Sequence, residues 1–498
     1  MSDTPPPVDR RDFLRSSAAV GTALTLSAQA YGRVSGANAR LGVAFLGCGG
    51  RAQAHINTVL KLKQEGQAVA PVAVCDVWDG LEDTYDHEFP PGQFTKRTYC
   101  QGLFPSAKKC GLNVNDSARV SKDYRRLLDL KDADVVCVAT PDHWHARMTL
   151  DALAAGKDVY VEKPMTRTAA EAQAVADAAA KFNRVVVVGV QGMADPSWLA
   201  ANELVRANRI GPVVQAQTGV HRNDVRGQWR YYRLSPKMTA KTVDWDRFLG
   251  HAFDVNGEPL GPTPKEVPFD RAAFAQWRCY SPFSGGVFTD LLAHKATQLL
   301  AATGLRYPRR VAGLGGLYWE HDGRDVPDVA TLVADFDEGA QFVFTATTVS
   351  GYPVEEVIRG RFGSIKFTKG ALHLVADDPT RASRLPGRLE KTVDPTEAVA
   401  ISPPANETQA MWEHFLGCVR DRSRATLCPP DLGAAAVAVA SMGVGSYRSG
   451  QVLTWDKEQR RVVSADGTWA ERWAARSKAR ERFAGMLPPK YMDLAGPT

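Results

Sequence analysis

The 498-residue sequence predicts an α/β protein with two domains, a doubly wound parallel sheet followed by an α+β domain with a large, mostly antiparallel open sheet. Three observations predict this order. A glycine-rich turn at 47–52 joins an apolar strand to a helical pattern. Short, wholly apolar strands then alternate with helices up to residue 192, as in parallel sheets covered on both faces. From residue 193, strands alternate apolar and polar residues, which is typical of an open antiparallel sheet.

The N-terminus precedes both domains and has its own pattern. Arg10-Arg11 is followed by a small, weakly apolar run, Ser16 to Ala28, and Ala28-Gln29-Ala30 fits a small-x-small cleavage site. This is typical of a twin-arginine signal, so we interpret residues 1–39 as a signal peptide and short linker. The run is too short to span a membrane. We therefore expect a mature protein without a membrane span, exported folded and located in the periplasm or secreted.

The first domain, predicted at 40–192, opens with the strand Leu41 to Leu46 and the G-x-G-x-x-A turn. In such a turn the first glycine permits the tight bend, and the second lets the backbone approach a pyrophosphate at the helix N-terminus. The next strand ends at Asp76, whose carboxylate can accept both ribose hydroxyls and repels a 2′-phosphate. This favours a Rossmann fold that binds NAD rather than NADP. The expected contacts are Gly47, Gly49, Gly50, Arg51 and Asp76.

Residues 80–120 interrupt this pattern with an aromatic, Gly- and Pro-rich segment that shows no clear period. We interpret it as an insertion over the sheet edge, serving as a lid or a partner surface.

A β-α-β unit at 135–165 carries most of the reactive side chains of the first domain. The strand Val135 to Ala139 leads into Thr140-Pro141-Asp142 and a helix, and the strand Asp158 to Val161 leads into Glu162-Lys163-Pro164. Ligands of parallel sheets bind at the carboxyl ends of the strands, where both groups lie. Pro164 disfavours a helical Lys163, so this lysine is expected to point into the crevice. A last strand near 185 ends at Gln191.

The second domain, predicted at 193–404, contains six expected strands and an irregular linker at 376–404. The open face of its sheet predicts a homo-oligomer, a dimer or tetramer, paired through that face. Helices at Glu407 to Arg420 and Leu432 to Gly450 place 405–456 back on the first domain, and 457–498 form a tail without a readable pattern. The six strands are Val213–Val220, Val311–Tyr318, Ala330–Asp335, Gln341–Thr348, Glu356–Gly360 and Ser364–Thr368.

Charge and residue spacing argue against two further classes, nucleic-acid-binding proteins and metalloproteins. The formal charge of +6 is mild for this length, and no dense run of Lys and Arg predicts nucleic-acid binding. None of the eight cysteines shows zinc-ligand spacing. His143 and His145 are two residues apart, which is a poor spacing for sharing one helix face and one metal ion. We therefore expect no metal site. Cys100 with Cys110, and Cys418 with Cys428, are close enough in sequence to bridge, which the sequence leaves open.

The segment Gly285-Gly286 to His294 is the second candidate for chemistry. Asp290 and His294 are four residues apart, so on a helix they share one face. An acid beside an imidazole can fix its tautomer and raise its basicity. Alone, such a pair is more often an ordinary polar contact.

Together, these motifs resemble the Gfo/Idh/MocA oxidoreductases, a family of sugar and cyclitol dehydrogenases. The matching features are the Gly47 to Ala52 turn, Thr140-Pro141, Glu162-Lys163-Pro164 and the Gly-Gly-x-x-x-Asp-x-x-x-His segment, in the family's order over roughly 41–455. Exported members with an Arg-Arg signal and a Thr-Pro-Asp-His-Trp-His turn are the nearest likeness. Many members carry Asn where this chain has Asp142.

The resemblance implies roles for individual residues. Lys163, Asp290 and His294 would be catalytic: His294 takes the hydroxyl proton, Asp290 holds and polarises His294, and Lys163 stabilises charge on the oxygen. Further cofactor contacts would be Thr140, Pro141, His145, Glu162, Lys163 and Gln191. Polar and aromatic residues suited to a carbohydrate, or else to an ordinary surface loop, are His221, Arg222, Trp277, Arg278 and Tyr280.

The function expected from this set is NAD(H)-dependent hydride transfer with a sugar or cyclitol, on a tightly held, non-exchanging nicotinamide. Free NAD is not expected outside the cytoplasm, which is why the cofactor would be recycled in place. An alternative is an NAD-dependent glycoside hydrolase that oxidises, eliminates and reduces again. A third reading is a sugar-binding or scaffold protein on the same fold, against which the joint presence of Lys163, Asp290 and His294 argues.

Overall fold

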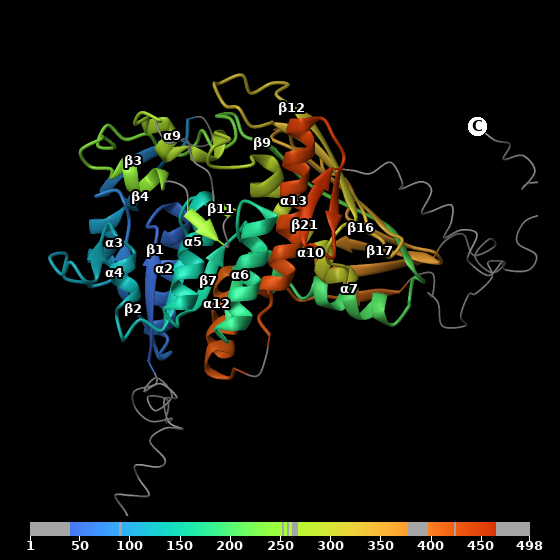
Figure 1. Cartoon of the computed structure of the whole chain (residues 1–498), viewed down its shortest axis with the longest axis horizontal. Coiled ribbons are helices and arrows are strands. Elements are labelled where there is room, and N and C mark those ends of the chain that lie inside the picture. The colour runs from blue at the N-terminus through green and yellow to red at the C-terminus, as the bar shows by residue number, and fades with distance from the viewer. Residues whose placement is uncertain are drawn as a thin grey trace, which may run out of the picture.

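The computed structural model describes residues 40–88, 92–250, 253–255, 258–260, 267–376, 397–422 and 425–464 (Figure 1). The predicted signal peptide, most of the predicted 376–404 linker and the tail from residue 465 lie outside the described residues.

The first domain contains a six-stranded parallel sheet in the order β5-β2-β1-β6-β7-β8. Its strands are short and almost entirely buried, as the apolar runs predicted. The order reverses at β1, so the turn after β1 opens where ligands of such sheets bind. The strands are β1 (Leu41–Leu46), β2 (Val69–Cys75), β5 (Val120–Ser121), β6 (Val135–Val138), β7 (Asp158–Glu162) and β8 (Val186–Gly189).

Helices cover both faces of this sheet. The best capped is α6, where Thr168 and Glu171 satisfy each other's backbone N–H groups in a capping box. The helices of this domain are α2 (Gly50–Gln64), α3 (Leu103–Lys109), α4 (Arg125–Leu128), α5 (Asp142–Ala154) and α6 (Ala169–Lys181).

Residues 80–120, predicted to be one irregular insertion, instead contain regular elements. It begins with a hairpin, β3 (Leu81–Glu88) paired with β4 (Phe94–Gln101), and then supplies α3 and β5 of the first domain. The hairpin escaped detection because most of β4 is exposed. A strand without a buried face needs no alternation of apolar and polar residues.

The second domain is a mixed sheet of eleven strands, in which β9 and β14 are parallel and the other neighbours are antiparallel. In β13 and β14, every second residue is buried, which confirms the predicted alternation. The predicted strands are β9 (Val213–Asn223), β12 (Arg310–Gly316), β13 (Val329–Asp335), β14 (Gln341–Thr347), β16 (Val357–Gly360) and β17 (Gly363–Thr368).

Five strands of this sheet were not predicted. Four of them have only two to four residues, and the fifth, β18, follows β17 after a two-residue turn. β20 pairs with β12 and β21 pairs with β20, so they extend the sheet into a region interpreted from sequence as part helix and part tail. The five are β15 (Val349–Ser350), β18 (Ala371–Ala376), β19 (Ala398–Ala400), β20 (Leu453–Asp456) and β21 (Arg461–Ser464).

Helices line one face of the second sheet and join it to the first domain (Figure 1). Helix α13 (Pro430–Ser449) packs against β12 on one side and against α6 and β8 on the other. Its small residues allow close approach: a Cβ on Gly313 of β12 would lie 2.3 Å from the carbonyl oxygen of Gly443. Helix α12 (Glu407–Arg420) packs against α2, and α7 (Ser197–Arg206) and α10 (Ala293–Thr303) lie side by side. One hydrophobic core therefore runs through both domains.

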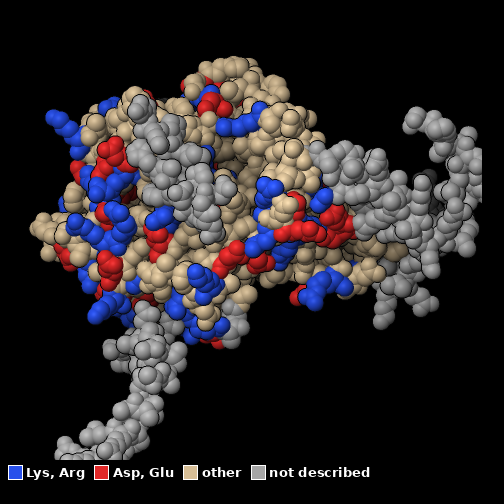
Figure 2. Space-filling view, viewed as in Figure 1, with Lys and Arg blue, Asp and Glu red and all other residues tan. Residues whose placement is uncertain are grey.

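Three further observations concern the whole described chain. All eight cysteines are free, so neither of the two bridges left open by the sequence is formed. No described helix is long and apolar enough to cross a bilayer. On the face shown in Figure 2, Lys and Arg are interspersed with Asp and Glu.

Candidate active site

A cavity of about 690 Å³ lies between the two domains. From the first domain it is lined by the glycine-rich turn, by Asp76 at the end of β2 and by Thr140-Pro141 at the end of β6. From the second domain it is lined by parts of 232–250 and 274–278. The turn and strand ends named from the sequence therefore share one cavity.

The glycine-rich turn leaves room for a ligand on one side only. Gly47 has φ +85°, and a Cβ there would lie 2.7 Å from the carbonyl oxygen of Ala139, so this position requires glycine. Gly49 has open space around its Cβ position. No side chain of the described residues caps α2, so the N–H groups of its first turn are available to an anion. This is a cradle for the pyrophosphate of a dinucleotide.

Asp76 forms the wall of the cavity next to this turn. Its carboxylate accepts the backbone N–H of Cys48 at 2.6 Å and of Trp78 at 2.8 Å. Burial raises the pKa of Asp76 to about 6, against the opposing effect of these hydrogen bonds and of Lys122. The carboxylate keeps acceptor capacity toward the cavity, where a ribose would lie.

The Thr140-Pro141 turn also fits a bound cofactor. The hydroxyl of Thr140 is buried and has no hydrogen-bond partner among the described residues, which is costly unless a ligand supplies one. His145 was expected to contact the cofactor, but its ring bonds the backbone instead. Its ring nitrogens lie 2.6 Å from the carbonyl oxygen of Pro164 and 2.9 Å from that of Thr140, away from the cavity lining. It ties the ends of β6 and β7 together.

Two neighbours of this turn are buried in α5. Burial raises the pKa of Asp142 to about 7, and its Oδ2 atom has no partner in the described part of the chain. Burial lowers the pKa of His143 to about 3, and its Nε2 atom lies 2.6 Å from the carbonyl oxygen of Phe248. The described residues contain no group of three His, Cys, Asp or Glu side chains suited to a metal ion.

Glu162 is the centre of a buried network behind the glycine-rich turn. Its Oε1 atom accepts from Arg51 at 2.7 Å and from Gln191 at 2.9 Å, and His55 Nε2 lies 2.8 Å away. Although burial opposes it, Arg51 and His55 hold the pKa of this carboxyl well below its usual range. Arg51 lines the cavity, whereas Glu162 and Gln191 do not.

Two members of this network, His55 and Trp412, were missed in the sequence. The indole N–H of Trp412 on α12 donates to His55 Nδ1 at 2.9 Å. Because an indole can only donate, Nδ1 of His55 must be the acceptor, and the Nε2 proton is the one given to Glu162. No local motif signals this contact, since α12 lies far along the chain.

Lys163 and Asp290 meet across the domain boundary. Lys163 Nζ donates to the side-chain Oδ1 and to the backbone carbonyl of Asp290, each at 2.8 Å. Arg278 Nε reaches the same Oδ1 at 2.9 Å, and the indole of Trp229 donates to Oδ2 at 3.0 Å. Although burial opposes it, the charges of Lys163 and Arg278 hold the pKa of Asp290 well below its ordinary value. Asp290 is thus an ionised, fully bonded carboxylate.

His294 is the second residue of α10, which continues directly from the π-helical segment Val287–Leu292 that contains Asp290. Burial and the nearby charge of Lys163 lower the pKa of His294 to about 3, against a smaller opposing effect of Asp290. The sequence led us to expect that Asp290 bonds the His294 ring. In the described chain, the hydrogen bonds of the Asp290 carboxylate go to Lys163, Arg278 and Trp229 instead. Two cations and an indole compete for the carboxylate more strongly than a neutral imidazole can.

The expected carbohydrate contacts separate into two groups. Arg278 lines the cavity, with its guanidinium 4.1 Å from the ring of Trp277 and 5.4 Å from that of Tyr232, which was not predicted. The charge of Arg222 contributes to the lowered pKa of His294, which places the guanidinium near that imidazole. His221 contacts Thr345 across the sheet, and the Tyr280 hydroxyl lies 3.2 Å from Arg230.

We call residues 233–250 the clasp segment, because this part of the second domain covers the cavity and bonds to the first domain. Val243 forms a β-bridge with Trp78, and the N–H of Asp244 donates to the carbonyl of Val77 at 2.8 Å. Arg233 forms an ion pair with Asp83 of the β3–β4 hairpin at 2.7 Å. A ligand in the cavity is therefore enclosed by both the clasp segment and the hairpin.

Comparison with protein families gives two matches that together exceed half of the chain. Residues 41–190 match the model described as an oxidoreductase family with an NAD-binding Rossmann fold, GFO_IDH_MocA. Residues 246–371 match the GFO/IDH/MocA C-terminal domain.

Individual relatives are more distant. Levoglucosan dehydrogenase of Pseudarthrobacter phenanthrenivorans is 34% identical over 94 residues, 19% of this chain and 24% of that protein. Alpha-N-acetylgalactosaminidase of Shewanella oneidensis is 24% identical over 230 residues, 46% of this chain and 44% of that protein. The matches thus span less than half the length of these curated relatives. The solved structure of levoglucosan dehydrogenase with NADH and levoglucosan is similar in fold, with a TM-score of 0.55, 16% identity and coverage of 83% of this chain and 99% of that one.

Substitutions in the glycine-rich turn should separate folding from ligand binding. Gly47→Ala should lower the melting temperature of the cofactor-free protein, because its Cβ meets the Ala139 backbone and its φ is positive. Gly49→Ala has open space, so the free protein should keep its stability while NAD affinity falls at least tenfold. Calorimetric melting and NAD titration measure the two effects. Equal destabilisation by both variants would contradict the proposed geometry.

The buried His294 should couple stability to pH. Its folded pKa of about 3 lies below that of an unfolded histidine, so only the unfolded chain takes up its proton as pH falls from roughly 6.5 towards 3. Stability from this group is therefore lost on acidification. His294→Gln should reduce proton uptake on unfolding by up to about one per molecule in this range. Denaturant titrations from pH 4 to 7 measure this proton uptake. His373, an exposed residue of β18, provides the control, and His373→Gln should leave the pH dependence of stability unchanged.

Proposed function

The chain belongs to the Gfo/Idh/MocA oxidoreductases, and we propose that it transfers hydride between a sugar or cyclitol hydroxyl or ketone and a tightly held nicotinamide. The observation that carries this proposal is the meeting of Lys163 from the first domain with Asp290 from the second, beside His294. The Arg278 side chain links this group to the NAD cavity, since it bonds Asp290 and lines the cavity wall.

The three side chains divide the work on the substrate oxygen. His294 is neutral at working pH and can accept the hydroxyl proton. Lys163, oriented by two oxygens of Asp290, offers its remaining N–H to the charge that develops on the same oxygen. Asp290 keeps Lys163 in place and balances its charge. A bound nicotinamide would supply the acceptor for the hydride of the carbinol carbon, so the products would be a carbonyl compound and a reduced cofactor.

Residues for holding NAD are those of the cavity wall. The turn at Gly47 to Gly50 would receive the pyrophosphate, Asp76 the adenosine ribose and Thr140 the nicotinamide half. Asp76 favours NAD over NADP because a 2′-phosphate would face its carboxylate.

Tight retention of the cofactor is supported by the clasp segment. The Val243–Trp78 bridge and the Arg233–Asp83 ion pair hold the clasp segment beside the cavity, so opening of these contacts would ease the release of a dinucleotide. This suits a protein exported folded by the twin-arginine pathway to the periplasm or beyond, where the cofactor must be reused. Reuse requires a second substrate that returns the hydride, or a reaction that is redox-neutral overall.

A redox-neutral reaction is the second candidate function. The relative named alpha-N-acetylgalactosaminidase aligns with a larger share of this chain than the dehydrogenase does. With a bound nicotinamide as hydride acceptor, the same residues would serve the oxidation of a ring hydroxyl to a ketone. Loss of the proton next to that ketone together with the aglycone would give an unsaturated ketone, addition of water would replace the aglycone, and return of the hydride would restore the hydroxyl. A binding or scaffold role would leave Lys163, Asp290 and His294 without a purpose.

We also propose that copies of the chain pair through the open face of the second sheet. That face carries the partly exposed residues that alternate with the core residues of β13 and β14. Light scattering of the purified protein gives the number of subunits, and a monomer would exclude this pairing.

One experiment distinguishes the two candidate functions. The purified protein is first denatured in acid, and we expect roughly one NAD per chain in the supernatant. The intact protein is then given levoglucosan, myo-inositol or 4-nitrophenyl N-acetyl-α-D-galactosaminide. A ketone product with a reduced cofactor supports the oxidoreductase, and a freed sugar without net redox change supports the hydrolase. Lys163→Ala should lower either rate at least a hundredfold, and unchanged rates would contradict the proposal.

Retention of the cofactor can be tested separately. Arg233→Gln removes the ion pair to Asp83, so NAD should dissociate a few-fold faster, the scale expected of one partly exposed pair. Arg460→Gln removes a comparable exposed pair with Asp177, far from the cavity, and should leave dissociation unchanged. Release is followed by trapping free NAD with an auxiliary dehydrogenase. Equal rates for both variants would show that the clasp segment does not retain the cofactor.

A further inference from the structure

Trp229 adopts a backbone conformation that its residue type disfavours. It has φ +66°, the left-handed region that favours glycine, and its side chain is 1% exposed. A bulky residue persists there only when its surroundings impose the conformation, and such strain is concentrated at functional sites. The question is what holds Trp229 and what its placement achieves.

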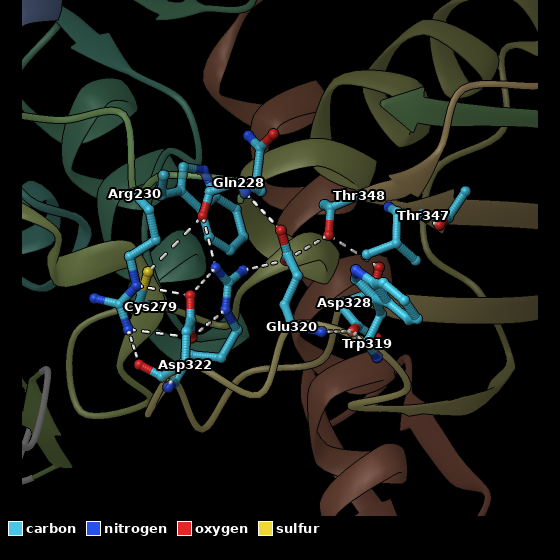
Figure 3. A network of polar contacts seen from close by, with 12 residues as sticks. Gln228, Arg230, Cys279, Trp319, Glu320, Asp322, Asp328, Thr347 and Thr348 are labelled. Atoms are coloured by element: carbon cyan, nitrogen blue, oxygen red, sulfur yellow. Dashed lines mark hydrogen bonds and ion pairs between the residues drawn. The ribbon is translucent and has the colours of Figure 1, made fainter. Parts of the chain in front are cut away.

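The residue before Trp229 is held by a buried ion network (Figure 3). The N–H of Gln228 donates to Glu320 Oε1 at 2.6 Å, and the Gln228 carbonyl accepts from Arg324 Nη2 at 3.0 Å. Arg324 is fully buried and bonds Glu320 at 2.5 Å and Asp322 at 2.6 and 2.9 Å. Glu320 is held further by the hydroxyl of Thr348 at 2.8 Å. A buried network in which each charge is paired is rigid.

The residue after Trp229 is held as firmly. Arg230 donates to Asp322 at 2.8 Å and to Gln276 at 2.7 Å, and Gln276 in turn donates to the Arg230 carbonyl. Asp322 therefore joins both flanks of Trp229, through Arg324 on one side and Arg230 on the other (Figure 3). The backbone at 228–230 has no freedom to relax the strained residue.

The result of this arrangement is one hydrogen bond. The indole N–H of Trp229 donates to Asp290 Oδ2 at 3.0 Å, the oxygen that neither Lys163 nor Arg278 uses. Resting on the proposed function, we infer that Trp229 is a positioning residue of the reaction, which fixes the Asp290 carboxylate so that it orients Lys163. The Glu320–Arg324–Asp322 network holds Trp229 in that role.

Two consequences follow from the direction of this bond. With Oδ2 occupied, the carboxylate cannot rotate, so Oδ1 stays aligned with Lys163. Because an indole N–H can only donate, its bond to the ionised carboxylate is stronger than its bond to the protonated carboxyl would be, so it favours the ionised form. Without it, Oδ2 would be free to bond the neighbouring His294 and draw Asp290 away from Lys163.

Trp229→Phe removes the N–H and keeps most of the ring. With whichever of the three sugar probes the wild type converts, kcat should fall about tenfold, the scale of one hydrogen bond to a charged group. KM and NAD affinity should change less than threefold, and the acid limb of the pH–rate profile should move to higher pH. Trp455→Phe, equally buried on β20 and stacked on Tyr307, is the control and should change neither kcat nor the limb.

A milder variant and a measurement without substrate complete the test. Arg230→Lys keeps the charge beside Asp322 but not the fork of hydrogen bonds, so it should shift kcat and the acid limb in the same direction by less. Trp229→Phe should lower the denaturation midpoint at pH 7 more in the wild type than in an Asp290→Ala background, because the second background has no carboxylate for the indole N–H to hold. Trp455→Phe should lower the midpoint by the same amount in both backgrounds.

The inference is overturned if Trp229→Phe folds and matches the wild type in kcat and acid limb, or if its effect on the denaturation midpoint is the same with and without the Asp290 carboxylate. A wild type inactive on all three probes would count against the proposed function alone. The comparison of the two backgrounds would then still decide whether Trp229 fixes Asp290.

Discussion

The contact on which this molecule depends is the ion pair between Lys163 and Asp290. The lysine ends β7 in the first domain, and the acid precedes α10 in the second, so neither domain alone assembles the site. A buried charge left without its partner is strongly destabilising, because the remaining ion has lost its water. Two further donors to the Asp290 carboxylate, Arg278 and Trp229, reduce that risk. Both the proposed hydride transfer and the alignment of the two domains thus rest on the same carboxylate.

Two rigid supports stand behind this contact, one in each domain. On the first, Glu162 gathers Arg51, His55 and Gln191, and connects the glycine-rich turn to the strand end that carries Lys163. On the second, the charged cluster around Arg324 sets the path of the chain at 228–230. Each support is centred on one buried charge, Glu162 in the first domain and Arg324 in the second, and each of these charges has an oppositely charged partner. Hydrogen bonds, and not packing alone, therefore specify the geometry of both supports. The reactive groups therefore need little rearrangement when a substrate arrives.

The sequence was sufficient for features that a local pattern encodes. The parallel strands were readable because they are wholly apolar, and the open sheet because β13 and β14 alternate. Lys163, Asp290 and His294 were identified by family motifs, and the structure brings the first two into contact. The sequence predicts a contact between Asp290 and His294, because residues four apart can share a helix face, whereas in the structure Asp290 bonds Lys163, Arg278 and Trp229. The sequence does not show which side chains reach that face from elsewhere. The contacts of Trp229, Trp412 and Arg324 were missed for the same reason. Their roles arise from contacts between distant segments, and no spacing or composition indicates them.

The second sheet has an edge that depends on the end of the described chain. β12 pairs on one side with β13 and on the other with β20, which follows α13 late in the sequence. β20 lies opposite only Arg310 and Val311 of β12. Before residue 453 is synthesised, this end of β12 has no neighbouring strand on that side, and an unpaired strand edge can pair with another chain. A chain shortened before residue 453 should therefore associate with other chains more readily than the full-length protein.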